Sequence, residues 1–158
     1  MSEGSRDVIV AAGCFWGVEH AFAQIPGILD TEVGYTGGSV EQPTYEQVCT
    51  GTTGHVEAVR VTYNPSQTSF EALLNTFFSI HDPTQQGGQG IDIGPQYQSV
   101  VFFAGDEERA VAQRVRTEVG KQYVGKPIAT TIRPRGTFWR AEDYHQGYIE
   151  KHEQNNAT

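Results

Sequence analysis

The sequence predicts an α+β fold, with a ferredoxin-like (split βαβ) two-layer core, two long loops and an extra C-terminal helix. The first observation is the order of the first six predicted elements, β-α-β-β-α-β. The second is the length: 158 residues suffice for one domain with a core and are too few for two, so a single domain over residues 1–158 is expected. The third is periodicity, since apolar residues recur at strand-like and helix-like spacings.

The N-terminal part supplies a strand, a helix and two more strands. Residues 8–12 form a short apolar run and predict the first strand. Residues 13–24 predict a helix that ends before Pro26-Gly27. Its buried stripe would consist of Phe15, Val18, Phe22 and Ile25.

Residues 28–35 and 56–63 predict the second and third strands. In the third strand, alternation places one set of apolar residues on a single face: Val59, Val61 and Tyr63.

The C-terminal part continues the alternation of helices and strands. Residues 68–81 predict a helix, with Thr68 and Glu71 at the spacing of a capping box. The remaining segments are a strand over 98–103, an amphipathic helix over 106–124, a fifth strand over 128–132 and terminal helical turns over 142–152.

Two connections, residues 35–55 and 82–97, exceed the roughly 12–15 residues that structureless loops in compact domains usually reach. Aromatic and apolar residues stand among their glycines, so we expect both loops to wrap around a functional site. The alternative is a pair of mobile surface loops. The residues of chemical interest within them are Tyr45, Cys49, His55, Asp92 and Tyr97.

Composition excludes several classes of protein. The net charge of -8 and the pI near 5.0 argue against a nucleic acid or an anionic membrane as partner. No apolar stretch approaches the roughly 20 residues of a membrane span, and the first ten residues do not resemble a signal peptide. Two cysteines without a disulfide framework favour a reducing compartment, so a cytoplasmic location is expected.

Cys14, in the stretch VAAGCFWGVEH, lies where the first strand passes into the first helix. The free N–H groups and the positive dipole end of a helix favour an anion there, and the thiolate is the nucleophilic form of cysteine. Cysteine is also among the most frequently buried residues, so an inert core thiol is the alternative.

Glu57 falls on the core-facing side of the third strand. An unpaired carboxylate is expensive in that position, and burial would raise its pKa until the carboxyl stays protonated near neutral pH. Glu57 is therefore predicted to be a proton donor. The alternative is a solvated strand end, or an ion pair with Arg60 or Arg133.

Other chemical motifs are absent. The glycines of GGQGIDIG miss the G-x-G-x-x-G spacing, and no P-loop lysine follows. The cysteines and histidines lack paired close spacing, so neither a metal site nor another cofactor is expected. A Cys–His–Asp hydrolase stays open, because its partners need only be close in space.

Six segments, in order, resemble the peptide methionine sulfoxide reductases of the A type: GCFWGVE, GYTGG, PTYEQVCTGTTGHVEAV, FFSIHDPTQ, QGIDIGPQYQS and FWRAEDYHQGY. The resemblance covers about residues 8–148. It implies an oxidoreductase of protein repair under oxidative stress, which reduces methionine-S-sulfoxide, free or in oxidised proteins and peptides, to methionine.

The resemblance also implies roles for the residues that match the family's motifs. Cys14 matches the nucleophile, which would end as a sulfenic acid. Phe15 and Trp16 match the pocket for the substrate's S-methyl group. Glu57 matches the acid that protonates the sulfoxide oxygen.

Three loop residues match further parts of the site. Tyr45 and Tyr97 match hydroxyls that bond the sulfoxide oxygen, and Asp92 matches an acid that orders the site. Family members often have Asn before this acid and a polar residue after it. Here Ile91 and Ile93 stand at those positions, which weakens the assignment of Asp92.

The second departure from the family's pattern concerns how the oxidised Cys14 would be reduced again. Many members carry resolving cysteines in a glycine-rich C-terminal tail, and this sequence has no cysteine after Cys49. The position of Cys49 is usually a buried residue in the family, so the expected reductant is an outside thiol: thioredoxin, or glutathione with a glutaredoxin. Cys49 as the resolving thiol is the less favoured alternative. A monomer is expected.

Two competing interpretations place Cys14 in other chemistry. One is a thiol peroxidase or hydrolase, which would need no methyl pocket. The other is a non-catalytic redox sensor in which Cys14 and Cys49 pair. Incubation with each methionine sulfoxide epimer and dithiothreitol separates these interpretations by the release of methionine.

Overall fold

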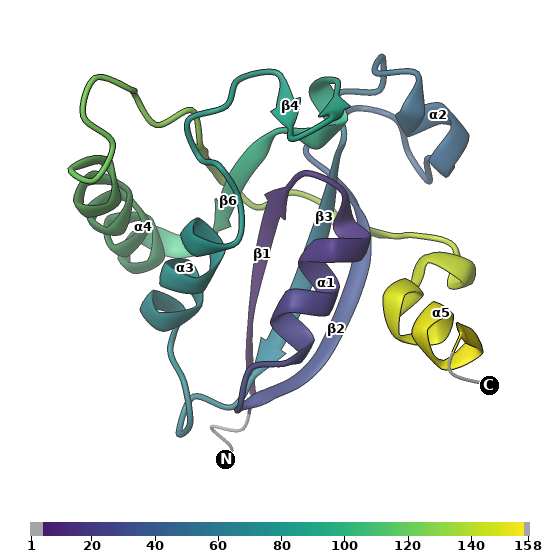
Figure 1. Cartoon of the computed structure of the whole chain (residues 1–158), viewed down its shortest axis with the longest axis horizontal. Coiled ribbons are helices and arrows are strands. Elements are labelled where there is room, and N and C mark those ends of the chain that lie inside the picture. The colour runs from purple at the N-terminus through teal and green to yellow at the C-terminus, as the bar shows by residue number, and fades with distance from the viewer. Residues whose placement is uncertain (1–4, 157–158) are drawn as a thin grey trace.

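A computed structural model describes the backbone of residues 5–156 and the side chains of residues 5–152. It has the predicted α+β architecture, a mixed sheet with helices packed on it (Figure 1). The sheet order is β7-β6-β1-β3-β2-β8. In that order the strands are β7 (Thr131–Pro134), β6 (Ser99–Phe103), β1 (Arg6–Ala12), β3 (Val56–Tyr63), β2 (Ile28–Thr36) and β8 (Trp139–Arg140).

The four central strands are antiparallel to one another. β1 pairs with β3, with Val8 opposite Val61, and on its other side with β6, with Val10 opposite Val101. β2 pairs with β3 through a register that sets Tyr35 opposite Glu57. β7 is parallel to β6, because a helix crosses between them.

The helices gather on one face of the sheet. They are α1 (Phe15–Ala23), α3 (Phe70–Ser79) and α4 (Gly105–Gly120), while α2 (Tyr45–Cys49) and α5 (Tyr148–Asn156) flank the sheet near its ends (Figure 1). Apolar residues of α1, α3 and α4 form one buried core with that face. A smaller core on the opposite face contains Ile9, Ala11, Val56, Ala58, Val100 and Phe102.

The predicted stripe of α1 is buried, with Phe15, Val18 and Phe22 inside and Ile25 packed at the edge. The helix of residues 68–81 is shorter than predicted, and its cap is different. Ser69, not Thr68, caps α3, because its hydroxyl accepts the Ala72 N–H. The capping box expected at Thr68 and Glu71 is therefore wrong.

The fifth strand begins three residues later than predicted, as β7. The C-terminal segment forms a 3-10 turn, η2 (Asp143–His145), before α5, and the short strand β8 was not predicted. β8 has only two residues, which is too short for a periodic signal.

Both long loops contain ordered structure. The first carries α2, which opens with a capping box between Thr44 and Gln47. The second carries a small hairpin, β4 (Gly88–Gln89) and β5 (Asp92–Ile93), followed by a 3-10 turn, η1 (Pro95–Tyr97). These elements sit at the edge of the sheet where α1 begins (Figure 1).

Within residues 5–156, no helix combines the length and the hydropathy that a membrane crossing requires.

Candidate active site

Cys14 is the N-cap residue of α1, directly after β1. Gly13 makes the turn between them with φ of 95°, a conformation that favours glycine. A Cβ atom at Gly13 would stand 2.7 Å from Cβ of Gln89, so the turn packs tightly against β4. The strand-to-helix turn thereby presents the Cys14 thiol toward the hairpin, and the side chain is half-buried.

Burial raises the pKa of the Cys14 thiol to about 11, and the negative charges of Glu57 and Asp92 add to this. The N–H groups of Trp16 and Gly17 at the start of α1 oppose the shift. The helix N-terminus therefore acts in the predicted direction, but burial outweighs it. In the free protein the group is a thiol rather than a thiolate at neutral pH.

Glu57 is buried on the helix-covered face, 1% exposed. Its Oε1 accepts the Phe15 N–H at 3.2 Å, whereas Oε2 has no hydrogen-bond partner among the described residues. Burial raises its pKa to about 8, and Asp92 contributes to the shift. Neither Arg60 nor Arg133 pairs with it, since Arg60 bonds Glu32. A protonated Oε2 can thus donate a hydrogen bond that the protein leaves unmade.

The two tyrosines predicted for the site flank Glu57. Burial, with the charge of Glu57, raises the pKa of Tyr97 to about 12. Burial also raises the pKa of Tyr45, and the side chain of Cys49, one helical turn later, adds to the shift. Both phenols therefore stay protonated near neutral pH and act as hydrogen-bond donors.

Asp92 is half-buried in β5 and lines the same pocket as Cys14. Its charge raises the pKa of Cys14, Glu57 and Tyr97, so it lies within electrostatic range of all three.

The aromatic side chains at the start of α1 are held by the C-terminal segment. Trp16 Nε1 donates to Nδ1 of His145 at 2.9 Å, and the Trp16 ring stacks on Tyr148 with centroids 3.8 Å apart. Phe15 is 1% exposed and packs against the rings of Tyr45 and His145. An apolar aromatic wall therefore stands beside the carboxyl of Glu57.

Glu142 ties this wall to the first loop. Its carboxylate accepts the hydroxyl of Tyr35 at 2.8 Å and the N–H of Tyr45 at 2.9 Å. Burial opposes ionisation, but these hydrogen bonds lower the pKa of Glu142 below its ordinary value. Glu142 thus fixes the start of α2 and, with it, the position of Tyr45.

Sequence reasoning assigned no role to Glu142, His145 or Tyr148. His145 is fully buried. The available signal was the density of polar and aromatic residues in FWRAEDYHQGY, a segment without strand or helix periodicity. Such a segment is ordered only through side chains that contact other elements.

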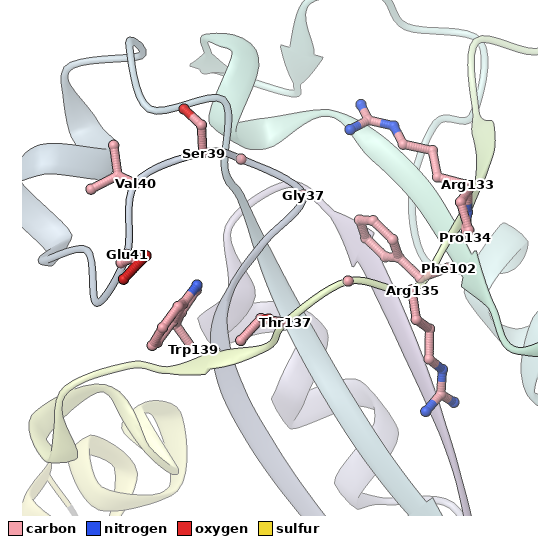
Figure 2. Close-up of a pocket in the computed structure, with 12 residues that line it drawn as sticks. Gly37, Ser39, Val40, Glu41, Phe102, Arg133, Pro134, Arg135, Thr137 and Trp139 are labelled. Atoms are coloured by element: carbon pink, nitrogen blue, oxygen red, sulfur yellow. The ribbon is translucent and has the colours of Figure 1, made fainter.

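Two pockets lie on opposite faces of the sheet. A pocket of about 420 Å³ is lined by Cys14, Asp92 and residues of α1. Another, of about 500 Å³, lies against Phe102, Arg133 and Trp139 on the other face of the sheet (Figure 2), and none of the predicted site residues lines it. Of the predicted site residues, Cys14 and Asp92 line the first pocket, whereas Glu57, the two tyrosines and the aromatic wall of α1 lie outside its lining.

Among the described residues, no group of three or more His, Cys, Asp and Glu side chains is arranged to hold a metal ion. Cys14 and Cys49 are both free cysteines.

Comparison with known proteins defines the class of this protein as an oxidoreductase. The family model described as peptide methionine sulfoxide reductase matches residues 6–158. The chain is 54% identical to a peptide methionine sulfoxide reductase MsrA of Methanoculleus marisnigri, over 89% of this chain and 86% of that protein. The chain therefore belongs to the peptide methionine sulfoxide reductase family, and it is an oxidoreductase that reduces methionine sulfoxide.

Solved structures of Mxr1 are similar to this chain in fold. Reduced Mxr1 from Saccharomyces cerevisiae has a TM-score of 0.91 and 35% identity, covering 98% of this chain and 89% of that one. Mxr1 in complex with Trx2 has a TM-score of 0.66 and 27% identity, covering 94% and 87% of the two chains.

Proposed function

We propose that the chain reduces methionine-S-sulfoxide through attack by Cys14, with Glu57 as the proton donor. The observation that carries this proposal is the buried Oε2 of Glu57, which has no partner in the described chain. A carboxyl with a pKa near 8 holds its proton at neutral pH, and an unmade hydrogen bond in a buried site awaits a ligand oxygen. The sulfoxide oxygen is such an acceptor.

In the first step, the Glu57 proton passes to the sulfoxide oxygen and makes the sulfur electrophilic. Cys14 attacks that sulfur, and its own proton returns to the Glu57 carboxylate. The bond between the two sulfurs and the S–O bond of the substrate then break as the oxygen, with its proton, migrates to the Cys14 sulfur and forms a new S–O bond there. Methionine leaves, reduced by two electrons, and Cys14 remains as a sulfenic acid, oxidised by two.

Recognition of one epimer follows from the opposed surfaces of the site. The wall of Phe15 and Trp16 suits the S-methyl group, whereas Glu57, Tyr45 and Tyr97 offer protons to the oxygen. These groups are fixed on different elements, so only one hand of the pyramidal sulfur satisfies both surfaces while facing Cys14. Asp92 orders the site through its charge.

In the second step, an outside thiol attacks the sulfenic acid, releases water and forms a mixed disulfide, which a further thiol reduces. The complex of Mxr1 with Trx2 supports a thioredoxin as reductant. Glutathione with a glutaredoxin is the second candidate. Cys49 is exposed and no disulfide joins it to Cys14, so we keep it as the less favoured resolving thiol.

The core itself is proposed to be ferredoxin-like. The order β6-β1-β3-β2, with antiparallel neighbours throughout, supports a split βαβ arrangement, to which β7, β8 and the C-terminal helix are additions. We further propose that residues 1–158 act as one catalytic domain, as a monomer in the cytoplasm. Two free cysteines fit a reducing compartment.

The test is the release of methionine from each sulfoxide epimer by the wild type and Cys14→Ser, with dithiothreitol as reductant. The wild type is expected to consume the S epimer alone, and Cys14→Ser neither epimer, while its circular dichroism spectrum stays unchanged. Turnover by a folded Cys14→Ser enzyme, or equal use of both epimers, would overturn the proposal.

A further inference from the structure

A groove extends from Cys14, the proposed nucleophile, along one face of α1. In a helix, residues three and four apart share a face, so Cys14, Gly17, Val18 and Ala21 lie together, whereas Trp16 points elsewhere. These four residues line the pocket of about 420 Å³, and Ile80 continues the lining beyond them. The groove is thus mainly apolar and starts at the thiol.

The opposite rim of the groove is the β4–β5 hairpin, which carries an unusual residue at its tip. Gly90 and Ile91 form the two-residue turn between Gln89 and Asp92. Turn tips of this kind favour Gly, Asn and Asp, yet Ile91 stands there with 96% of its surface exposed. Ile93 follows at 68% exposed. Neither isoleucine has a buried packing role that would explain it.

Side-chain hydrogen bonds tie the hairpin to the segment that precedes it in the same loop. The Gln89 amide bonds both the N–H and the C=O of Asp82, at 2.7 and 2.8 Å. The Gln85 amide bonds both the N–H and the C=O of Gly90. Ile91 therefore stands at the rim of the groove, on a hairpin whose turn is hydrogen-bonded to Gln85.

A peptide bound by its sulfoxide at Cys14 would extend over the surface beside the thiol, which includes the groove. The S-methyl group would face the wall of Trp16, which His145 and Tyr148 fix in place. The next residues of the peptide, at about 3.8 Å per Cα step, must pass over the surface next to Cys14. That surface includes the groove, whose only charged lining residue among those described is Asp92.

We propose that this groove, capped by Ile91, is a subsite for an apolar side chain next to the methionine sulfoxide in an extended peptide substrate. The proposal rests on the proposed function, since it presumes that the sulfoxide binds at Cys14. It assigns the enzyme a preference for oxidised methionines in apolar surroundings. Such segments become accessible when a folded protein opens, because folding buries them.

The experiment compares two otherwise identical hexapeptides in which methionine-S-sulfoxide has either leucine or serine on both sides. Each kcat/KM is measured with dithiothreitol and divided by the same enzyme's value for free methionine-S-sulfoxide. The wild type is expected to favour the leucine peptide by about tenfold, the scale of discrimination by a small apolar pocket. Dithiothreitol removes docking of a protein reductant from the measurement.

Two variants alter the groove, one in the hairpin and one in α1. Ile91→Asn removes the apolar cap with a residue that turns tolerate well, and Ala21→Leu fills the groove from α1. Both are expected to reduce the leucine-to-serine ratio to within about twofold of unity. Leu29→Asn is the matched control: Leu29 is an apolar residue, 56% exposed, at the end of the sheet away from Cys14, and its variant should keep the wild-type ratio.

A wild-type ratio near one would overturn the subsite while leaving the reduction of sulfoxide by Cys14 intact. A ratio that survives both groove variants would place the preference elsewhere on the molecule. Absence of turnover on free methionine-S-sulfoxide would instead contradict the proposed function itself. If Ile91→Asn altered turnover only with thioredoxin as reductant, the exposed isoleucines would contact the reductant, and the subsite proposal would be rejected.

Discussion

The two oxygens of Glu57 have different surroundings, and this difference explains how a buried carboxyl can serve as an acid. Oε1 is fixed by the Phe15 N–H, which ties the carboxyl to the start of α1, while Oε2 is left for a ligand. Burial keeps the proton in place up to a pH near 8. Position and protonation thus come from the same packing.

Replacing Glu57 by glutamine removes the transferable proton and keeps the shape of the side chain. We expect kcat/KM for methionine-S-sulfoxide to fall by about 10²–10⁴-fold, the usual contribution of a general acid. Tyr45→Phe and Tyr97→Phe should each lose much less, because either phenol can partly cover for the other. Near-native turnover by Glu57→Gln would mean that water or a tyrosine supplies the proton.

Substitution of Trp16 tests the proposed pocket for the S-methyl group. Trp16→Ala should raise KM and lower kcat together, since it loosens both the binding of the S-methyl group and its alignment with Cys14. Trp139→Ala is the control, because Trp139 lines the remote pocket of Figure 2. An unchanged KM in Trp16→Ala would show that Trp16 belongs only to the core.

At the scale of elements, the site combines two periodic elements with several short segments that have little periodicity of their own. α1 and β3 supply Cys14 and Glu57, and both elements could be predicted because their apolar residues follow helix and strand spacings. The α2, η1 and η2 segments are too short for such a signal. They are ordered by side-chain contacts, such as those of Glu142, which depend on residues about 100 positions apart.

Cys49 lies on α2, one turn after Tyr45, and its role as a resolving thiol can be tested. Cys49→Ser is expected to keep multiple turnover with thioredoxin, because serine is close to cysteine in size and an outside thiol resolves Cys14. One equivalent of methionine-S-sulfoxide without reductant should leave a sulfenic acid on Cys14, detected by dimedone labelling and mass spectrometry.

Cys14→Ser under the same conditions is the control and should give no dimedone adduct. The external route would be contradicted by a Cys14–Cys49 disulfide in the wild type together with a Cys49→Ser enzyme that stops after one turnover.

For the whole molecule, the sequence predicted the α+β class, the central strands and the core stripe of α1. These features depend on local periodicity and on burial, both of which are visible in one chain. The raised pKa of Cys14 was not predictable from the sequence. Burial and the carboxylates of β3 and β5 raise this pKa by more than the N-terminus of α1 lowers it. The cap of α3 was misplaced by one residue, since Thr68 and Ser69 are both good caps and tertiary packing chooses between them.

The raised pKa of Glu57 also predicts a dependence of global stability on pH. Below a pH of about 4.5 the carboxyl is protonated in both states. Between 4.5 and about 8 it ionises only when unfolded, so the folded state loses relative stability as the pH rises. Glu57→Gln should therefore gain stability over the wild type across this window, by about 1.4 kcal/mol per pH unit at most, and reach a plateau above it.

Urea unfolding at several pH values measures this difference. Glu71→Gln is the control with the opposite sign, because Arg114 lowers the pKa of Glu71, and its contribution is lost as the pH falls. A Glu57→Gln difference that does not change between pH 5 and 8 would show that the carboxyl is already ionised in the folded protein.

The central claim is that Cys14 takes the oxygen of the sulfoxide. One equivalent of methionine-S-sulfoxide labelled with oxygen-18 is added to the wild type without reductant, and the protein is trapped with 4-chloro-7-nitrobenzofurazan, which retains the oxygen of a sulfenic acid. Mass spectrometry of the peptide that contains Cys14 should show the adduct carrying oxygen-18, in proportion to the methionine released. An adduct with unlabelled oxygen, or methionine release without modification of Cys14, would contradict the account.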